Sequence, residues 1–132
     1  GYDISATKGH KIWMMVEIPS NVILINQFIN EGITGVSIGS NDLTELTLGV
    51  DRDNERLESS FDERDPSILW ALERVITAAK KQGITSSICG QAPSFFPDLT
   101  EKLVKWGITS VSVSPDSIDS TRNLIYRIEK TL

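Results

Sequence analysis

The chain has 132 residues, which is enough for one compact domain and too few for a two-domain enzyme. Hydrophobic residues make up 39% and charged residues 23%, so a disordered or fibrous protein is excluded. Thirteen Lys and Arg against eighteen Asp and Glu give a net charge of -5, the wrong sign for a protein that binds nucleic acid through its phosphates.

Short apolar runs alternate with helical stretches from the start of the chain. A strand is predicted at residues 12–16, and a helix capped by Ser20 runs from there to about Asn30. A second strand is predicted at 35–38 and a short amphipathic helix at 42–48. The repeated unit is therefore a strand followed by a helix.

The second half of the chain repeats this unit. A long helix is predicted at 66–82, with Pro in its first turn and Gly just past its end. Strands at 86–89 and 111–113 are each followed by a helix, at 97–107 and 115–130.

Apolar strands joined by crossover helices predict parallel strands with right-handed connections, so the fold class is α/β. Four such units make half of a TIM-type (β/α)8 barrel, which typically takes ~250 residues. The first and last strands then have unpaired edges that a missing segment, another copy or closure on a smaller sheet must cover. We therefore expect a fragment of a longer protein or an obligate assembly.

Polar residues follow the predicted strands, at the end where ligands bind in parallel α/β folds. Glu17 follows the first strand, Ser40, Asn41 and Asp42 follow the second, and Cys89 ends the third. These residues are expected on one face of the molecule.

Glu17 and Asp42 are candidates for a metal site, because their strands could be neighbours ~4.8 Å apart. Mg²⁺ is commonly held by one or two carboxylates while substrate oxygens and water complete its coordination. In the ordinary alternative Glu17 pairs with a lysine and Asp42 caps a helix that begins at Leu43.

Cys89 is the single cysteine and His10 the single histidine, so an intrachain disulfide and a Cys/His metal cluster are excluded and a reducing cytoplasm is expected. The thiol either fills space in the core or transfers a proton. A Cys-His nucleophile is disfavoured because His10 precedes the first strand, at the opposite end of the sheet. Trp13, Trp70 and Trp106 are expected to pack in the core.

The segment 51–65 is a charged loop, in which ten of fifteen residues carry a charge. Its ordinary interpretation is a solvated surface. The alternative is that Arg52 supplies the forked donor that a phosphate or carboxylate needs. The apolar runs of the chain are far shorter than the ~20 residues of a membrane span, so no membrane partner is expected.

Five segments carry a family resemblance that spans nearly the whole chain: MMVEIPSN (14–21), GVSIGSNDLTELTLGVDRDN (35–54), FDERDP (61–66), ICGQAPS (88–94) and GITSVSVSPDSI (107–118). Together, in this order and spacing, they resemble the carboxyl-terminal half of the phosphoenolpyruvate-binding barrel of the phosphoenolpyruvate synthases. Pyruvate phosphate dikinase and enzyme I of the sugar phosphotransferase system are similar too, and the Cys-Gly-Gln-Ala-Pro-Ser stretch favours the synthases.

The resemblance implies that residues 1–132 are a piece of a cytoplasmic enzyme that makes phosphoenolpyruvate from pyruvate. In such enzymes a phosphoryl group passes from a phosphohistidine to pyruvate, with Mg²⁺ present and ATP consumed. The phosphohistidine and ATP-binding domains would be partners outside this chain, and the fragment alone would be inactive. Cys89 would handle the proton at the methyl carbon of the substrate.

The resemblance also implies roles for the other residues that follow the strands. Glu17 and Asp42 would bind Mg²⁺, while Asn41 and Arg52 would hold the phosphoryl group, with backbone or hydroxyl contacts from Ser40.

Two alternatives stay open. A Mg²⁺-dependent enolate lyase on a related barrel would use Glu17 and Asp42 but would not need Arg52. A non-catalytic assembly module would use the open strand edges for self-association, and a homo-oligomer is expected in either case.

Overall fold

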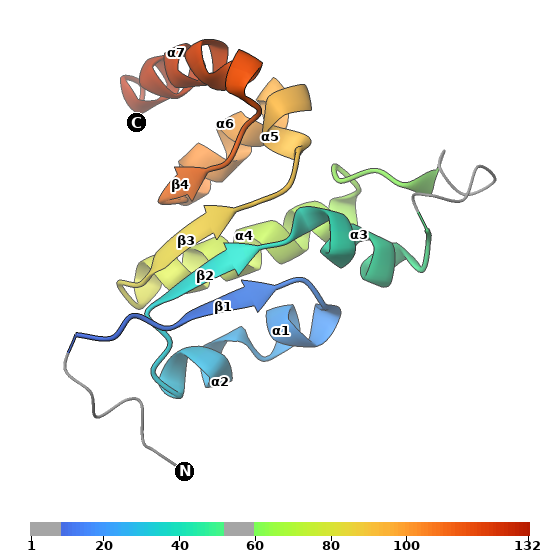
Figure 1. The fold of residues 1–132 in the computed structure, drawn as a ribbon, viewed down its shortest axis with the longest axis vertical. Helices are drawn as coiled ribbons and strands as arrows, with labels where there is room; N and C mark the ends of the chain where they lie inside the picture. Colours follow the sequence, from blue (N-terminus) through green and yellow to red (C-terminus); the bar gives the residue numbers. More distant parts are fainter. Residues whose placement is uncertain (1–8, 52–59) are drawn as a thin grey trace.

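The fold is an open parallel sheet covered by helices on one face (Figure 1). The structure is a computed structural model, and it describes residues 9–51 and 60–132. The sheet has four short parallel strands in the order β1-β2-β3-β4. The strands are β1 (Trp13–Val16), β2 (Gly35–Ile38), β3 (Thr85–Ile88) and β4 (Ser110–Val111). Each strand pairs with the next one along the chain in parallel register. The predicted α/β class and parallel sheet are confirmed, and the sheet is open at β1 and β4, as expected of half a TIM-type barrel.

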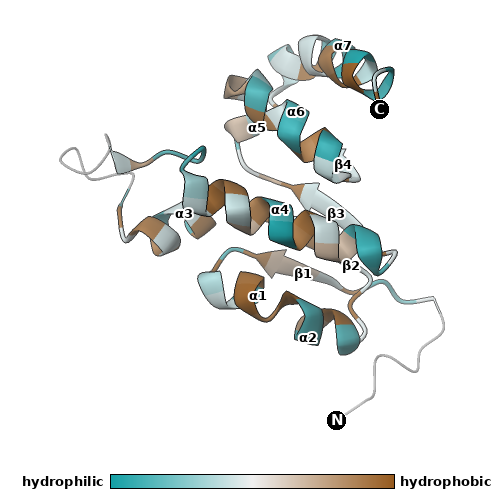
Figure 2. Ribbon diagram, turned by 180° about the vertical axis from the view of Figure 1, so that it is seen from behind, coloured by the Kyte–Doolittle hydropathy of each residue, from teal (hydrophilic) through white to brown (hydrophobic). Residues whose placement is uncertain are grey.

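The helices are α1 (Pro19–Ile23), α2 (Ile25–Asn30), α3 (Ser40–Leu48), α4 (Pro66–Lys81), α5 (Ala92–Phe95), α6 (Pro97–Trp106) and α7 (Ile118–Glu129), with a 3-10 turn η3 (Pro115–Ser117) before α7. Helix α4 lies behind the strands in Figure 1 and crosses in front of them in the reversed view of Figure 2. Helices α1 and α2 pack beside α4 on one side, and α6 packs between α4 and α7 on the other. The helix layer thus covers one face of the sheet.

The core lies between α4 and the sheet. Ile68, Leu72 and Val75 of α4 are fully buried, at the i, i+4, i+7 spacing of one helix face. They belong to one cluster with Ile38 of β2 and Ile88 of β3. This packing fixes the ends of the two central strands, where the candidate site residues begin.

The helix predicted after the first strand differs from expectation at both its start and its middle. Ser20 is not its N-cap; that position belongs to Ile18, and the Asn21 side chain reaches back from the first turn, where its Oδ1 accepts hydrogen bonds from the backbone N–H groups of Glu17 (3.4 Å) and Ile18 (3.3 Å). The helix also breaks at Leu24, which separates α1 from α2.

Other predicted elements are shifted or divided. The third and fourth strands each begin one residue earlier than predicted, and the fourth is only two residues long. Helix α3 begins at Ser40 rather than residue 42, because Gly39 is its N-cap. The short α5 was not predicted, and the last predicted helix is divided into η3 and α7.

The prediction that all three tryptophans lie in the core is wrong for two of them. Trp13 is 45% exposed and Trp70 is 57% exposed, whereas Trp106 packs against the core. Met14 and Val16 of β1 point into the core, so the alternating Trp13 and Met15 point to the face of the sheet that the helices leave bare.

Candidate functional site

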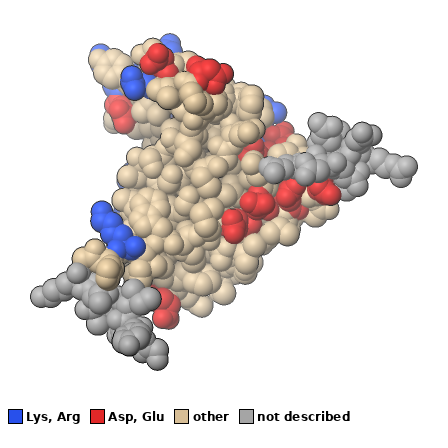
Figure 3. All heavy atoms as spheres, in the orientation of Figure 1, with Lys and Arg blue, Asp and Glu red and all other residues tan. Residues whose placement is uncertain are grey.

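The candidate residues meet at the carboxyl ends of β1, β2 and β3. The backbone ladder continues just past the strands, with Gly39 N–H donating to Val16 O and Cys89 N–H donating to Ile38 O, both at 3.0 Å. Glu17 and Gly39 therefore begin neighbouring loops, and Cys89 begins the next one. Figure 3 shows acidic residues gathered on this side of the molecule.

Glu17 lies across the end of the neighbouring strand. A Cβ at Gly39 would stand 3.1 Å from Glu17 Cβ and 3.2 Å from its Oε2, so the absence of a side chain at Gly39 makes room for the carboxylate. Glu17 is half-buried, and within the described ranges no lysine forms an ion pair with it. The ordinary alternative of a Glu17–lysine pair thus finds no support in this part of the chain.

Asp42 lies in the first turn of α3, and its side chain is exposed. It is not the N-cap, so the predicted capping role is wrong; that position belongs to Gly39. An acidic side chain in a first turn is favoured by the partial positive charge of the helix amino end. Asp42 is therefore placed on the same rim as Glu17, with its carboxylate accessible to a ligand.

These two carboxylates fit Mg²⁺, which needs only one or two protein carboxylates when substrate and water supply other oxygens. Over residues 9–51 and 60–132, no three Asp, Glu, His or Cys residues cluster to make a metal site from protein groups alone. A cation here would thus share its coordination with a ligand.

Asn41 faces a shallow pocket of about 330 Å³ between three loops. The pocket is lined by Asn41 after β2, by Phe61, Asp62, Glu63 and Arg64 before α4, and by Gln91, Phe95 and Phe96 after β3. An amide donor and a guanidinium donor thus line one polar recess next to the strand ends.

Ser40 is fully buried, and its Oγ has no hydrogen-bond partner among the described residues. Its carbonyl accepts a hydrogen bond from Thr44 Oγ1 at 2.7 Å, which secures the first turn of α3. A contact of Ser40 with a ligand would therefore come from its backbone, because the hydroxyl points inward.

Cys89 is exposed, and its Sγ donates a weak hydrogen bond to Ile38 O at 3.4 Å. The space-filling alternative for Cys89 is therefore wrong. His10 is exposed at the other end of the sheet, before β1, as the parallel strands require. The thiol is thus accessible on the rim, without a histidine beside it.

Arg52 lies outside the described residues. In the same charged segment, Arg64 forms two hydrogen bonds with the Asp62 carboxylate, at 3.1 and 3.3 Å, and stacks 4.3 Å above the Phe96 ring. The hydrogen bond from the Arg64 side chain lowers the pKa of Asp62 against a smaller opposing effect of burial.

Glu63 was missed by the sequence analysis. Only 6% of it is exposed, although it lies in the most charged segment of the chain. The number of charged residues in this segment does not show that Glu63 is the buried one, because its burial comes from packing against the loop after β3.

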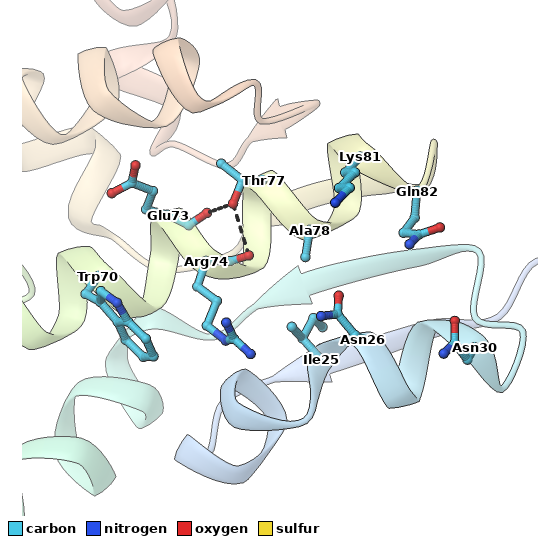
Figure 4. A pocket seen from close by; sticks show the side chains of 10 residues that line it. All are labelled: Ile25, Asn26, Asn30, Trp70, Glu73, Arg74, Thr77, Ala78, Lys81 and Gln82. Carbon is cyan, nitrogen blue, oxygen red and sulfur yellow. Dashed lines mark hydrogen bonds between the residues drawn. The ribbon is translucent and has the colours of Figure 1, made fainter.

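A second groove, of about 720 Å³, lies in the helix layer between α2 and α4 (Figure 4). It contains none of the residues predicted to bind metal or substrate. Trp70 and Arg74 stand side by side in it, with the guanidinium 5.7 Å from the ring centre. The groove is thus formed where helices α2 and α4 pack together.

None of the helices in the described part of the chain has the length and apolar character needed to cross a membrane.

The chain matches, over residues 2–130, the family described as "PEP-utilising enzyme, PEP-binding domain". It is 49% identical to a probable phosphoenolpyruvate synthase of Staphylothermus marinus over 127 residues, which cover 95% of this chain and 15% of that protein. It is likewise 49% identical to the phosphoenolpyruvate synthase of Helicobacter pylori, covering 97% of this chain and 16% of that protein. The chain therefore spans about one sixth of these relatives.

Among solved structures, the fold is similar to RipC from Yersinia pestis, with a TM-score of 0.62 at 14% identity. The match covers 91% of this chain and 54% of that chain. At this identity the likeness concerns the fold alone. The matched part is about half of the RipC chain, so the same arrangement of strands and helices there belongs to a larger chain.

Proposed function

The chain belongs to the PEP-utilising enzymes, as part of their PEP-binding domain, and from this premise we propose that it carries the metal-binding and proton-transfer half of a phosphoenolpyruvate synthase active site. The observation that supports this most is that Glu17, Asn41, Asp42 and Cys89 lie on one rim, at the ends of three neighbouring strands. The relatives named as phosphoenolpyruvate synthases supply the reaction class.

Glu17 and Asp42 would hold Mg²⁺. The metal would supply positive charge to the oxygens of pyruvate, which become more negative as the methyl carbon loses a proton. The lack of a side chain at Gly39 leaves room for the Glu17 carboxylate beside the start of α3, and Asp42 lies in the first turn of α3. The two residues would thus orient the substrate as well as bind the cation.

Asn41 and Arg52 would hold the transferred phosphoryl group, with Ser40 contributing through its backbone at the amino end of α3. Backbone N–H groups at a helix amino end and a guanidinium fork both suit phosphate oxygens. In phosphoryl transfer most of the catalysis is positioning and charge stabilisation, so these residues would act by holding the group in line with the accepting oxygen.

Cys89 would move the proton. As a thiolate its Sγ would accept a proton from the methyl carbon of pyruvate, and as a thiol it would return the proton in the reverse direction. The exposed Sγ on the rim is accessible for this role.

The phosphohistidine and the ATP site would come from other domains of the same cytoplasmic, self-associating protein, and the chain alone would not turn over. The test of the metal role is therefore made in the full-length enzyme, with the Glu17→Gln and Asp42→Asn variants and the exposed Glu31→Gln as control.

Each of the two site variants is expected to raise the Mg²⁺ concentration needed for half-maximal phosphoenolpyruvate formation by about tenfold or more, because a ligand is lost. The control keeps the wild-type requirement. If both site variants respond to Mg²⁺ as the wild type does, the metal assignment is wrong.

A further inference from the structure

Gly90, the residue after Cys89, is enclosed by side chains from two other segments of the chain. A Cβ at Gly90 would collide with Ser40 Oγ and would lie 3.3 Å from both Ser40 Cβ and Glu63 Oε1. Ser40 begins α3, and Glu63 precedes α4. The turn after β3 is thus packed against the segments that follow β2 and precede α4.

The requirement for glycine at this position comes from space and not from backbone conformation. Within residues 9–51 and 60–132 the glycines with positive φ are Gly9, Gly32, Gly49, Gly83 and Gly107, and Gly90 is not among them. Other residues could adopt its backbone angles, but their side chains would meet Ser40.

The buried Ser40 hydroxyl has no polar partner within the described part of the chain, a costly arrangement for a hydrogen-bonding group. Its contact with Gly90 gives it a steric role instead. Through this contact, the first turn of α3, which presents Asn41 and Asp42, bears directly on the turn that presents Cys89.

We infer that Ser40 is a positioning residue of the proposed reaction, with Gly90 as its counterpart: their contact sets the place of the Cys89 thiol relative to Asn41 and Asp42. This inference rests on the proposed function. It predicts that displacing the turn after β3 impairs proton transfer while substrate binding through α3 is kept.

The test is a double-mutant cycle in the full-length enzyme, with Gly90→Ala, Ser40→Gly and both changes together. Gly90→Ala should lower kcat for phosphoenolpyruvate formation by about a hundredfold, because the new Cβ must push the turn away from Ser40. The KM for pyruvate should change far less. In the Ser40→Gly background, where the obstructing side chain is gone, the same Gly90→Ala change should lower kcat by less than about threefold.

Gly35→Ala is the matched control. Its Cβ would also be obstructed, at 2.6 Å from Thr85 Oγ1 and from the Trp13 ring, but at the amino end of β2, away from the rim. It should lower the unfolding temperature, leave kcat of the folded enzyme near the wild-type value, and show no dependence on Ser40.

The inference is overturned if Gly90→Ala lowers kcat equally in both backgrounds, or if it leaves kcat unchanged. If Gly90→Ala alone does not fold, the double variant decides. A double variant that folds and is active supports the inference, and one that is unfolded or inactive overturns it. A wild-type enzyme that makes no phosphoenolpyruvate would instead contradict the proposed function, while the cycle in unfolding temperature would still report the packing contact.

Discussion

Arg64 and Asp62 form an ion pair, and we expect the ionisation of the Asp62 carboxyl to affect the stability of the folded protein. The side-chain hydrogen bond from Arg64 lowers the pKa of Asp62. A carboxyl whose pKa is lowered on folding stabilises the protein above its unfolded pKa of about 3.9, and this contribution is lost as the pH falls through the folded value. Both side chains are more than 40% exposed, so the effect is small.

We therefore expect Asp62→Asn to lower the unfolding temperature slightly at pH 7, with the difference from wild type shrinking as the pH drops below about 4. Thermal unfolding followed from pH 7 to pH 3 measures this. A difference that stays constant over that range would show that the ionised Asp62 carboxylate is not the cause.

For single residues, the sequence predicts which polar side chains follow the strands but not how these side chains pack. The positions of Glu17, Asn41, Asp42 and Cys89 follow from the ends of apolar strands, since parallel strands share one carboxyl edge. The burial of Ser40 could not be read from its neighbours in the sequence, because Gly90, which packs against its side chain, is fifty positions away.

Helices α1 and α2 are separated where a single element was predicted, and α4 supplies a reason. Arg74 Nε donates to Val22 O at 3.0 Å and its Nη2 donates to Ile23 O at 3.2 Å. These are carbonyls of the last turn of α1, which a continuous helix would have paired with its own N–H groups. The Arg74 guanidinium thus supplies hydrogen bonds to the carbonyls at the end of α1 and links this end to α4.

Arg74→Lys is expected to lower the free energy of unfolding by about 1–2 kcal/mol, because a lysine cannot donate to both carbonyls with a fixed fork. Denaturant unfolding measures the loss, and Glu73→Gln, an exposed change on the same helix, is the matched control. An Arg74→Lys variant as stable as the control would mean that the break at Leu24 does not depend on this contact.

Most elements were predicted to within a residue or two, and the exceptions are the break between α1 and α2, the short α5 and the division of the last helix into η3 and α7. Helix α4 begins at Pro66 and is followed by Gly83 with φ 69°, and α6 begins at Pro97 and ends at Gly107 with φ 96°. The carbonyls at the end of α1 accept hydrogen bonds from Arg74, about fifty residues away, and local sequence does not indicate such a contact.

The molecule as described has two unpaired strand edges, at β1 and β4, and a sheet face on which Trp13 and Met15 are exposed. Open edges and exposed apolar surface promote association. We predict that the isolated 132-residue chain is not a monodisperse monomer. Sedimentation velocity at micromolar concentration checks this, and a well-folded monomer would contradict it.

We propose that the rim at the ends of β1, β2 and β3 activates pyruvate, with Cys89 moving the methyl proton. Its most direct test is exchange of the pyruvate methyl protons with D2O, followed by NMR in the full-length enzyme supplied with Mg²⁺ and the substrates and products of the reaction. The wild type should exchange these protons, and Cys89→Ala should lose exchange by at least about a hundredfold while still binding pyruvate. Exchange by Cys89→Ala at the wild-type rate would show that Cys89 does not move the methyl proton.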